Sequence, residues 1–349
     1  MTIVETRVVC GGVDTHLEVH VAAAIDGNGG VLGVESFAVS EAGYRELFEW
    51  LAAVGEVVRV GVEGTGSYGA GLARFLRSSG VEVVEVDRPN RQARHRHGKS
   101  DPLDAVAAAR AALSGAATGR AKHRDGPVEA MRVLAVARRS ARCQRTATLV
   151  QMRQLCFCAP EPIRARFAGL SAFQLVNQVA ALRPRARNPI DIECVTLLTL
   201  RTLAHRVRGL ADELDWIADE LEPLVAGFAP ELLDVFGVGV DTAATLLIAA
   251  GDNPQRLRSE AAWAHLCGVA PVPASSGKVT RHRLNRGGDR QANAALHRIV
   301  LVRMRHHSAT RTYVARRRAE GRTNLEIMRC LKRYVAREVY RTLPRTRLG

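Results

Sequence analysis

Four carboxylates occur where the chain could assemble a site for phosphoryl transfer. Asp14 follows an apolar run in the segment GVDTH, and Glu63 follows another in GVEGTG. Asp101 and Asp104 share the segment KSDPLDA, and their spacing puts both on one face of the first turn of a helix. Four such groups repel one another unless cations lie between them, and two divalent ions about 3.5–4 Å apart are a common solution. The residue types and spacing therefore predict a two-metal site that acts on phosphate esters.

Each of these carboxylates also has a simpler interpretation. An aspartate after a strand is often a turn residue, and Asp101 with Asp104 could cap a helix and complement its dipole. The glycines that follow Glu63 favour either a tight turn or close approach of a phosphate to the backbone. The metal site is therefore predicted from the four residues together, in their order along the chain.

A second segment could hold or attack a phosphate. GVAPVPASSGK carries Ser275 and Ser276 in a stretch rich in proline and glycine. Basic residues of the same region are Lys278, Arg281, Arg283, Arg286 and Arg290. Cations around a serine would hold the scissile phosphate and stabilise the charge that develops on it, which suits a nucleophilic hydroxyl. A loop that binds phosphate without a covalent step is the alternative, and spacing alone favours that alternative.

A third segment, GVGVDTAATLL, is typical of a helix-hairpin-helix element. Gly237 and Gly239 would let backbone N–H groups approach a nucleic-acid phosphate without regard to sequence. A glycine-rich turn between two packed helices explains the same spacing equally well.

The distribution of charge points to a polyanionic partner. The 349 residues carry a net charge of +15, yet residues 1–87 are acidic and the rest of the chain is strongly basic. A solvated basic surface is the alternative. No apolar run approaches the ~20 residues of a membrane span, and the start does not predict a cleaved signal peptide. The seven cysteines show no zinc-binding spacing and predict a reduced, cytoplasmic protein.

The hydrophobic pattern predicts a mixed α/β domain at the N-terminus. Strands are expected over 7–13, 17–25, 31–39, 57–62 and 81–86, with helices over 41–54, 68–79 and from about 101. The first three strands should form an antiparallel meander, because glycine and asparagine at 27–30 predict a tight turn. This is the order of a ribonuclease H-like domain, in which the first and fourth strands are neighbours. A Rossmann fold fits less well, because no Gly-x-Gly-x-x-Gly follows the first strand.

The rest of the chain predicts an all-α region. Residues 126–154 have helical spacing, 156–193 are expected to be irregular because of four prolines, and 191–224 form one long helix candidate. That helix could be a coiled-coil arm with a dimer contact or an ordinary core helix. We therefore expect three domains: 1–125 with the carboxylates, 126–228 as a helical linker or arm, and 229–349 with the serine loop and a basic tail.

Taken together, these motifs resemble the insertion sequence 110 family of transposases. The likeness lies in GVDTH, GVEGTGSYG, KSDPLDA, GVGVDTA and GVAPVPASSGK, followed by HRLNRGGDRQANAALH. It implies a RuvC-like domain whose Asp-Glu-Asp-Asp set, here Asp14, Glu63, Asp101 and Asp104, binds two Mg²⁺ ions. It also implies a C-terminal transposase domain whose nucleophilic serine precedes a glycine, which here is Ser276. On this point the family pattern reverses the interpretation that spacing alone favours.

The resemblance also implies a function and partners. Members of this family move an insertion sequence by site-specific DNA recombination, guided by a structured bridge RNA from the element itself. The expected partners are DNA at the element ends and target, that RNA, and further copies of the chain in a homodimer or homotetramer. The protein would be cytoplasmic and associated with the nucleoid when it acts. A junction endonuclease of the Holliday type, without a covalent serine intermediate, and a nucleic-acid-binding scaffold without turnover are the alternatives.

Overall fold

The structure is a computed structural model that describes residues 7–86, 100–117, 119–184, 191–276, 279 and 281–344. The chain forms two compact units. The first unit comprises Met1–Gly126 with Gly251–Arg256, and the second comprises Pro127–Ala250 with Leu257–Gly349. The second unit thus contains both the predicted arm and the predicted C-terminal domain, and the division into three domains stays a prediction. No helix in the described ranges combines the length and apolar character needed to cross a bilayer.

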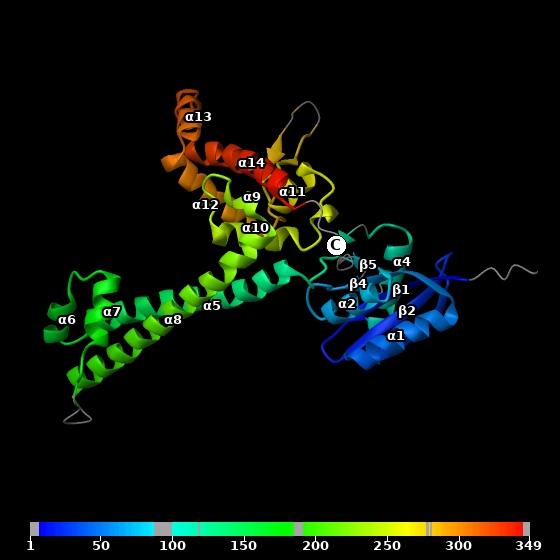
Figure 1. Cartoon of the computed structure of the whole chain (residues 1–349), viewed down its shortest axis with the longest axis horizontal. Coiled ribbons are helices and arrows are strands. Elements are labelled where there is room, and N and C mark those ends of the chain that lie inside the picture. Colours follow the sequence, from blue (N-terminus) through cyan, green and yellow to red (C-terminus); the bar gives the residue numbers. More distant parts are fainter. Residues whose placement is uncertain are drawn as a thin grey trace, which may run out of the picture. The chain divides into compact units, whose positions relative to one another are not determined.

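A six-stranded mixed sheet forms the centre of the first unit, with the order β3-β2-β1-β4-β5-β6. Figure 1 labels four of these strands, β1, β2, β4 and β5. Its strands are β1 (Val8–Thr15), β2 (Val19–Asp26), β3 (Val31–Ala38), β4 (Glu56–Glu63), β5 (Glu82–Val86) and β6 (Gly119–Arg120). The first three strands pair antiparallel, which confirms the predicted meander. Strands β1 and β4 are parallel neighbours, as expected. The short strand β6, which pairs antiparallel with β5, was not predicted.

Helices cover both faces of this sheet. The helices α1 (Glu41–Val54) and α2 (Ala70–Ser78) contribute Leu47, Leu51 and Leu72 to a core cluster with strand residues of one face. The helix α4 (Asp101–Leu113) packs on the other face through a run of alanines. The side chains of β1 and β2 alternate between the two helical layers, which is why these strands are buried along most of their length, whereas β3 at the edge is mostly exposed.

Two glycines let α4 lie directly on the backbone of the sheet. A Cβ atom at Gly12 would come within 2.1 Å of the Ala109 nitrogen, and one at Gly61 within 2.6 Å of the Ala108 oxygen. Both distances are far below van der Waals contact, so no other residue fits at either position without moving the helix. This close packing fixes where the first turn of α4 lies along β1 and β4.

The second unit begins with two long helices that run side by side, α5 (Pro127–Cys158) and α8 (Ile192–Phe228) (Figure 1). The buried positions of α8, including Leu200, Leu210 and Ile217, recur every three or four residues as the sequence predicts. The predicted irregular stretch 156–193 is wrong in part. It contains the last turn of α5 and the helices α6 (Glu161–Phe167) and α7 (Ala172–Ala180).

The prolines did not prevent these helices because of where they stand. Pro160 is the N-cap of α6 and Pro162 lies in its first turn, where the missing N–H has no intrahelical partner to lose. Ser171 begins α7 with a capping box to Gln174. The helix α8 continues to Phe228 with Pro223 inside it, four residues beyond the predicted end.

The remainder of the second unit is a helical bundle with one small hairpin. Its helices are α9 (Pro230–Leu233), α10 (Val240–Ala250), α11 (Glu260–Leu266), α12 (Arg290–His306), α13 (Ser308–Ala319) and α14 (Asn324–Thr342). Trp263, Leu246, Leu296 and Val335 lie in the core cluster that these helices share. The hairpin joins β7 (Val272–Pro273) to β8 (His282–Arg283) and carries the two candidate serines.

Candidate active site

Asp14 and Glu63 lie on the face of the sheet that α4 covers. The register pairs Val13 of β1 with Val62 of β4, so Asp14 and Glu63 are the next residues of two parallel neighbours. Side chains alternate between the two faces of a sheet along each strand. Asp14 therefore lies on the same face as Gly12, and Glu63 lies on the same face as Gly61. Both glycines face α4, as their contacts with its backbone show. The two carboxylates therefore end adjacent strands on one face, as the sequence predicts.

Asp101 and Asp104 lie at the start of α4, in its first turn. Ser100 is the N-cap of this helix, and its carbonyl accepts the first hydrogen bond, from the Asp104 N–H at 3.1 Å. Because α4 is pressed against Gly12 and Gly61, its first turn is held near the ends of β1 and β4. The close helix packing is thus what brings carboxylates from distant parts of the sequence to the same edge.

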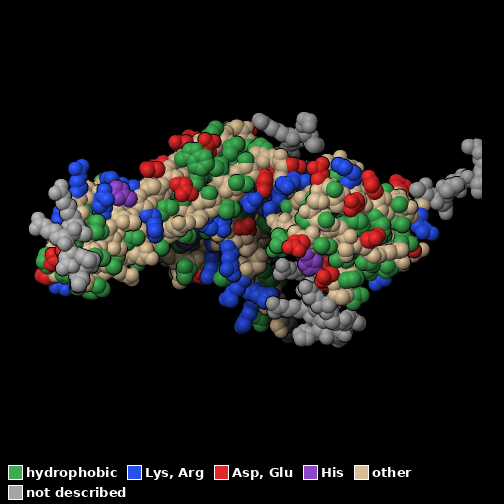
Figure 2. Space-filling view, turned by 90° about the horizontal axis from the view of Figure 1, so that it is seen from below, with side chains coloured by type: hydrophobic (Ala, Val, Ile, Leu, Met, Phe, Trp, Pro, Cys, Tyr) green, Lys and Arg blue, Asp and Glu red, His purple; other side chains and the backbone are tan. Residues whose placement is uncertain are grey.

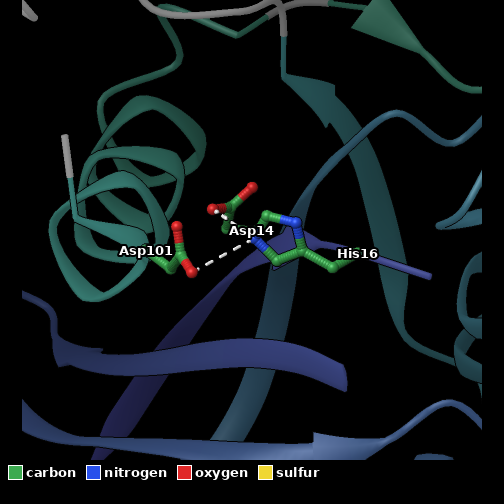
Figure 3. Close-up of side chains that lie close together, drawn as sticks. All are labelled: Asp14, His16 and Asp101. Carbon is green, nitrogen blue, oxygen red and sulfur yellow. Dashed lines mark ion pairs between the residues drawn. The ribbon is translucent and has the colours of Figure 1, made fainter. Parts of the chain in front are cut away.

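The side chains of Asp14, His16 and Asp101 converge at this edge (Figure 3). The His16 Nε2 atom lies 3.2 Å from Asp14 Oδ2 and 3.4 Å from Asp101 Oδ2. One ligand-type atom from each residue lies within 4.8 Å of the others, a spacing that could accommodate a cation. His16 comes from the end of β1 and stands between the two carboxylates, which the sequence analysis did not predict. Its signal was its place two residues after Asp14, where strand alternation puts both on one face.

Electrostatics at Asp14 favour a positive ligand. Asp14 is only 6% exposed, and its Oδ2 atom has no hydrogen-bond partner in the described part of the chain. Burial raises the pKa of this carboxyl, His16 lowers it, and the nearby charges of Asp104 and Asp101 raise it further. A buried carboxylate surrounded by other carboxylates is stabilised when a cation lies beside it.

The structure brings the four predicted carboxylates together only in part. Asp104 acts on the pKa of Asp14, but neither Asp104 nor Glu63 belongs to the group of atoms within 4.8 Å. Glu63 instead lines an adjoining cavity of about 240 Å³, with Thr15, Tyr68 and Glu85 among its other walls. The main-chain carbonyl of Glu63 accepts a 2.8 Å hydrogen bond from the Thr15 hydroxyl, which ties the two strand ends together.

In the second unit, the two serines of the β7–β8 hairpin make different hydrogen bonds. The Ser275 hydroxyl accepts a hydrogen bond from the Arg281 N–H at 3.2 Å and lies 3.5 Å from the Arg281 carbonyl. Ser276 is exposed and pairs with Val279 through backbone hydrogen bonds of 3.1 and 3.2 Å, which leaves its side chain out of the ladder. Within the described ranges, no hydrogen bond engages the Ser276 hydroxyl. In the described residues, Ser275 is thus engaged through its side chain and Ser276 through its main chain.

The predicted phosphate-binding residues fall into two groups. Arg283, Arg286 and Arg290 line one cavity of the second unit, and Arg281 is exposed on the hairpin. Lys278 lies outside the described residues.

The glycines of the predicted helix-hairpin-helix element lie in the turn before α10. Gly237 has a φ of +83°, which only glycine adopts easily. The Gly239 N–H donates a 3.0 Å hydrogen bond to the Thr242 hydroxyl, so this amide already has a partner within the chain. Binding of phosphate by this turn stays a prediction.

Two family models match the chain in order. A transposase model for the DEDD domain of IS110 matches residues 11–156, which include all four predicted carboxylates. A model described as the transposase of the IS116/IS110/IS902 family matches residues 229–315, which include the serine hairpin. The mixed sheet and its carboxylates agree with a DEDD nuclease-like domain followed by a helical region.

Curated relatives give the same assignment over shorter stretches. The chain is 33% identical over 145 residues to the insertion element IS110 uncharacterized 43.6 kDa protein of Streptomyces coelicolor, a match covering 41% of this chain and 35% of that protein. It is 32% identical over 103 residues to the insertion element IS900 uncharacterized 42 kDa protein of Mycobacterium paratuberculosis, covering 29% and 26% respectively. The matched stretch is thus about a third or less of either relative. This chain belongs to the IS110 family of transposases.

Proposed function

We propose that this protein is the transposase of an insertion sequence and acts as a site-specific DNA recombinase. The observation that carries the proposal is the convergence of Asp14, His16 and Asp101 at the strand ends. The charge of Asp104 acts on Asp14, and Glu63 ends the neighbouring parallel strand. The strand order, with three antiparallel strands and two parallel ones, supports a ribonuclease H-like fold of the RuvC type. The turn at Gly237 supports a helix-hairpin-helix-like element in the second unit.

We propose that Asp14, Glu63, Asp101 and Asp104 hold two Mg²⁺ ions. The donor set fits such ions, because oxygen ligands suit Mg²⁺ and the buried Asp14 Oδ2 lacks a hydrogen-bond partner in the described structure. Bound Mg²⁺ would supply positive charge at the phosphate and make a nearby hydroxyl easier to deprotonate. His16 Nε2 holds the two aspartate side chains in place and lies where it can accept or return a proton.

We propose that Ser276 is the nucleophile of the reaction. Its oxygen forms a bond to the phosphorus of a phosphodiester while the bond from phosphorus to the 3′ oxygen breaks. The serine proton passes to a base of the site and the 3′ oxygen receives a proton, which gives a 5′-phosphoserine link and a free 3′-OH. The exposed Ser276 and the arginines beside it support this role. Cleavage would depend on Ser276 and on the carboxylates alike.

The partners follow from this chemistry and from the charge. A net charge of +15 supports binding to DNA at the element ends and target, and to a structured bridge RNA that selects them. The exchange of several strands supports assembly as a homodimer or homotetramer. The protein would act in the cytoplasm, on the nucleoid.

The serine assignment is tested with two matched variants, Ser276→Ala and Ser275→Ala. Each is incubated with junction DNA, the flanking RNA of the element and Mg²⁺, and the products are denatured to detect protein that stays covalently attached to DNA. Ser276→Ala should bind DNA normally and form no adduct, whereas Ser275→Ala should form it. DNA cut without any adduct would instead support a Holliday-junction-type endonuclease that uses the carboxylates alone. An unchanged adduct with Ser276→Ala would exclude this residue as nucleophile.

A further inference from the structure

The second unit contains a cavity of about 780 Å³ at the base of the serine hairpin. It lies between the loop after α11, the strand β8 with the residues that follow it, and the helices α12 and α14. Its volume falls within the range of about 300–1,000 Å³ that is usual for ligand sites. The only charged side chains among its walls are the cations Arg283, Arg286, Arg290, Arg329, Lys332 and Arg333.

Most of these cations have no carboxylate partner among the described residues. Arg333 is bidentate on Glu260, with one contact at 3.1 Å. Across the part of the chain that the structure describes, no ion pair joins any of the other five cations to a carboxylate. The ammonium group of Lys332 is partly buried, and burial together with the charge of Arg329 lowers its pKa. Charges of one sign held this close indicate a site completed by an anion.

The walls of the cavity are held rigidly before any ligand binds. The Asn293 side chain donates to the Cys267 and Gly268 carbonyls at 2.9 and 3.2 Å, and its oxygen accepts from Lys332 Nζ at 2.9 Å. The Asn285 amide donates to the His265 carbonyl at 2.9 Å and fixes the loop that follows β8. Lys332 and the backbone of the two loops are therefore in place before a ligand binds, which lowers the entropy cost of binding.

The cavity also has apolar and aromatic walls. Val269, Pro271 and Leu284 line it, and the half-exposed ring of Tyr334 lies among the cations. A site for inorganic phosphate has no use for such surfaces, whereas a nucleotide has both an anionic group and a flat base. Base stacking on one aromatic side chain contributes about 1–3 kcal/mol.

We propose that this cavity binds one unstacked nucleotide of a single nucleic-acid strand and so positions the strand that Ser276 attacks. The inference rests on the proposed function. Pro271 and Arg283 stand at the base of the hairpin. The four steps along the chain from Val272 to Ser276 span about 13 Å at ~3.3 Å per residue. A nucleotide in the cavity would thus lie a few positions along the strand from the phosphodiester at Ser276.

The test measures binding without catalysis. The full chain is titrated, in EDTA, with fluorescent single strands of about eight nucleotides, oligo-dT and oligo-rU, and with a duplex and inorganic phosphate as competitors. Arg329→Gln, which replaces an exposed cation of the cavity, should weaken binding of single strands about tenfold and reduce the salt slope by about 1. Arg153→Gln on α5 makes the same charge change away from the cavity, and it should weaken binding less than about threefold. Lys332→Gln should act as Arg329→Gln does.

The aromatic wall distinguishes a nucleotide from a bare anion. Tyr334→Leu keeps an apolar side chain and should weaken binding of single strands about tenfold, which corresponds to about 1.4 kcal/mol, while binding of the duplex stays the same. A photoreactive thymine or uracil should crosslink within the segment that contains Tyr334. A preference for oligo-dT is expected for the strand that Ser276 attacks, whereas a preference for oligo-rU would identify the guide RNA as the ligand and overturn the assignment to the cut strand.

Several outcomes would overturn the proposal. Equal losses with Arg329→Gln and Arg153→Gln would show that only net charge matters. Full competition by inorganic phosphate, or an unchanged affinity with Tyr334→Leu, would exclude a nucleotide site. Because the assay needs neither Mg²⁺ nor Ser276, failure of the recombinase proposal, seen as a missing covalent adduct, is separate from failure of this one.

Discussion

Replacing Asp14 by asparagine should stabilise the folded protein when no divalent cation is present. Burial and the neighbouring carboxylates hold the pKa of this group above its ordinary value. The folded state thus binds the proton more readily than the unfolded chain does. Stability is therefore lost as the pH rises through the raised pKa, so at pH 8 the ionised side chain destabilises the fold. The neutral amide of Asp14→Asn removes this penalty and keeps the shape of the side chain.

The distances set the size of the effect. Two unit charges 4.8 Å apart, the limit for the Asp14–Asp101 pair, repel by about 3.5 kcal/mol at an effective dielectric constant of about 20. The Asp101 side chain is 43% exposed, so solvent screens much of this repulsion, and the His16 ring offsets a further part. We expect a gain of about 1–2 kcal/mol, or an increase of about 4–8 °C in Tm for a domain of this size.

Magnesium should reverse the order of stability. At a Mg²⁺ concentration of about one hundred times Kd, binding would stabilise the native protein by about 2.7 kcal/mol. Asp14→Asn should lose most of this shift, because the most buried ligand is gone. The assay is calorimetry of the full chain at pH 8 in EDTA and in MgCl₂, and hydrogen exchange of the β1 and β4 peptides assigns the change to the first unit.

The matched control is Asp26→Asn, the same substitution at the end of the neighbouring strand β2. The Asp26 carboxylate accepts hydrogen bonds from the Asn28 and Gly30 N–H groups at 2.8 and 2.9 Å, and these bonds lower its pKa. This variant should lower Tm in EDTA and keep the full magnesium shift. The reasoning is refuted if Asp14→Asn lowers Tm in EDTA, or if it retains the native response to Mg²⁺.

Two further substitutions test the packing around the site. His20 is fully buried with no partner for either ring nitrogen among the described residues, and burial lowers its pKa to about 4. The free energy of unfolding should therefore fall by up to about 3 kcal/mol as the pH drops from about 6.5 to 4. His20→Phe should flatten this pH dependence, measured by urea unfolding at pH 7.5 and 5. An unchanged pH dependence in the variant would contradict the view that buried His20 causes it. Gly12→Ala should destabilise the first unit by about 3 kcal/mol or more, because its Cβ would meet the backbone of Ala105 and Ala109 at 2.3 and 2.1 Å. Gly27→Ala, with nothing within 4 Å of the new atom, should leave the urea midpoint almost unchanged, and equal effects of the two would argue against the close packing of α4.

Local patterns predicted the sheet well because its signals are strong and close together. The apolar runs set the strands within a residue or two, and the turn around Gly29, with its φ of +86°, was evident from composition. The adjacency of β1 and β4 was predictable because the order of strands and helices along the chain is compatible with only a few sheet topologies. Asp14 and Asp101 were singled out because, together with Glu63 and Asp104, they fall in order at strand ends and a helix start, and the structure brings their side chains together.

Other features depended on tertiary contacts that leave little trace in the sequence. His16 gives no distinctive signal until α4 brings Asp101 to its ring. The β7–β8 hairpin has strands of two residues, too short for any alternation to show. Lys332 and Tyr334 lie more than about forty residues along the chain from the cavity's loop residues, such as Val269 and Arg286. The cavity was therefore not predictable from spacing in the sequence. Helix α7 was predictable, because Ser171 and Gln174 have the spacing of a capping box.

The first unit is discontinuous in sequence, and this affects how it can be made. The short segment Gly251–Arg256 belongs to it, and Asn253, only 3% exposed, donates a 2.9 Å hydrogen bond to the Ala121 carbonyl. A ribosome must therefore synthesise most of the chain before the first unit receives its last segment. A fragment that stops at residue 126 would leave the Ala121 carbonyl without that donor and expose the surface beneath, so expression of the nuclease-like half alone should give an unstable product unless this peptide is supplied in trans.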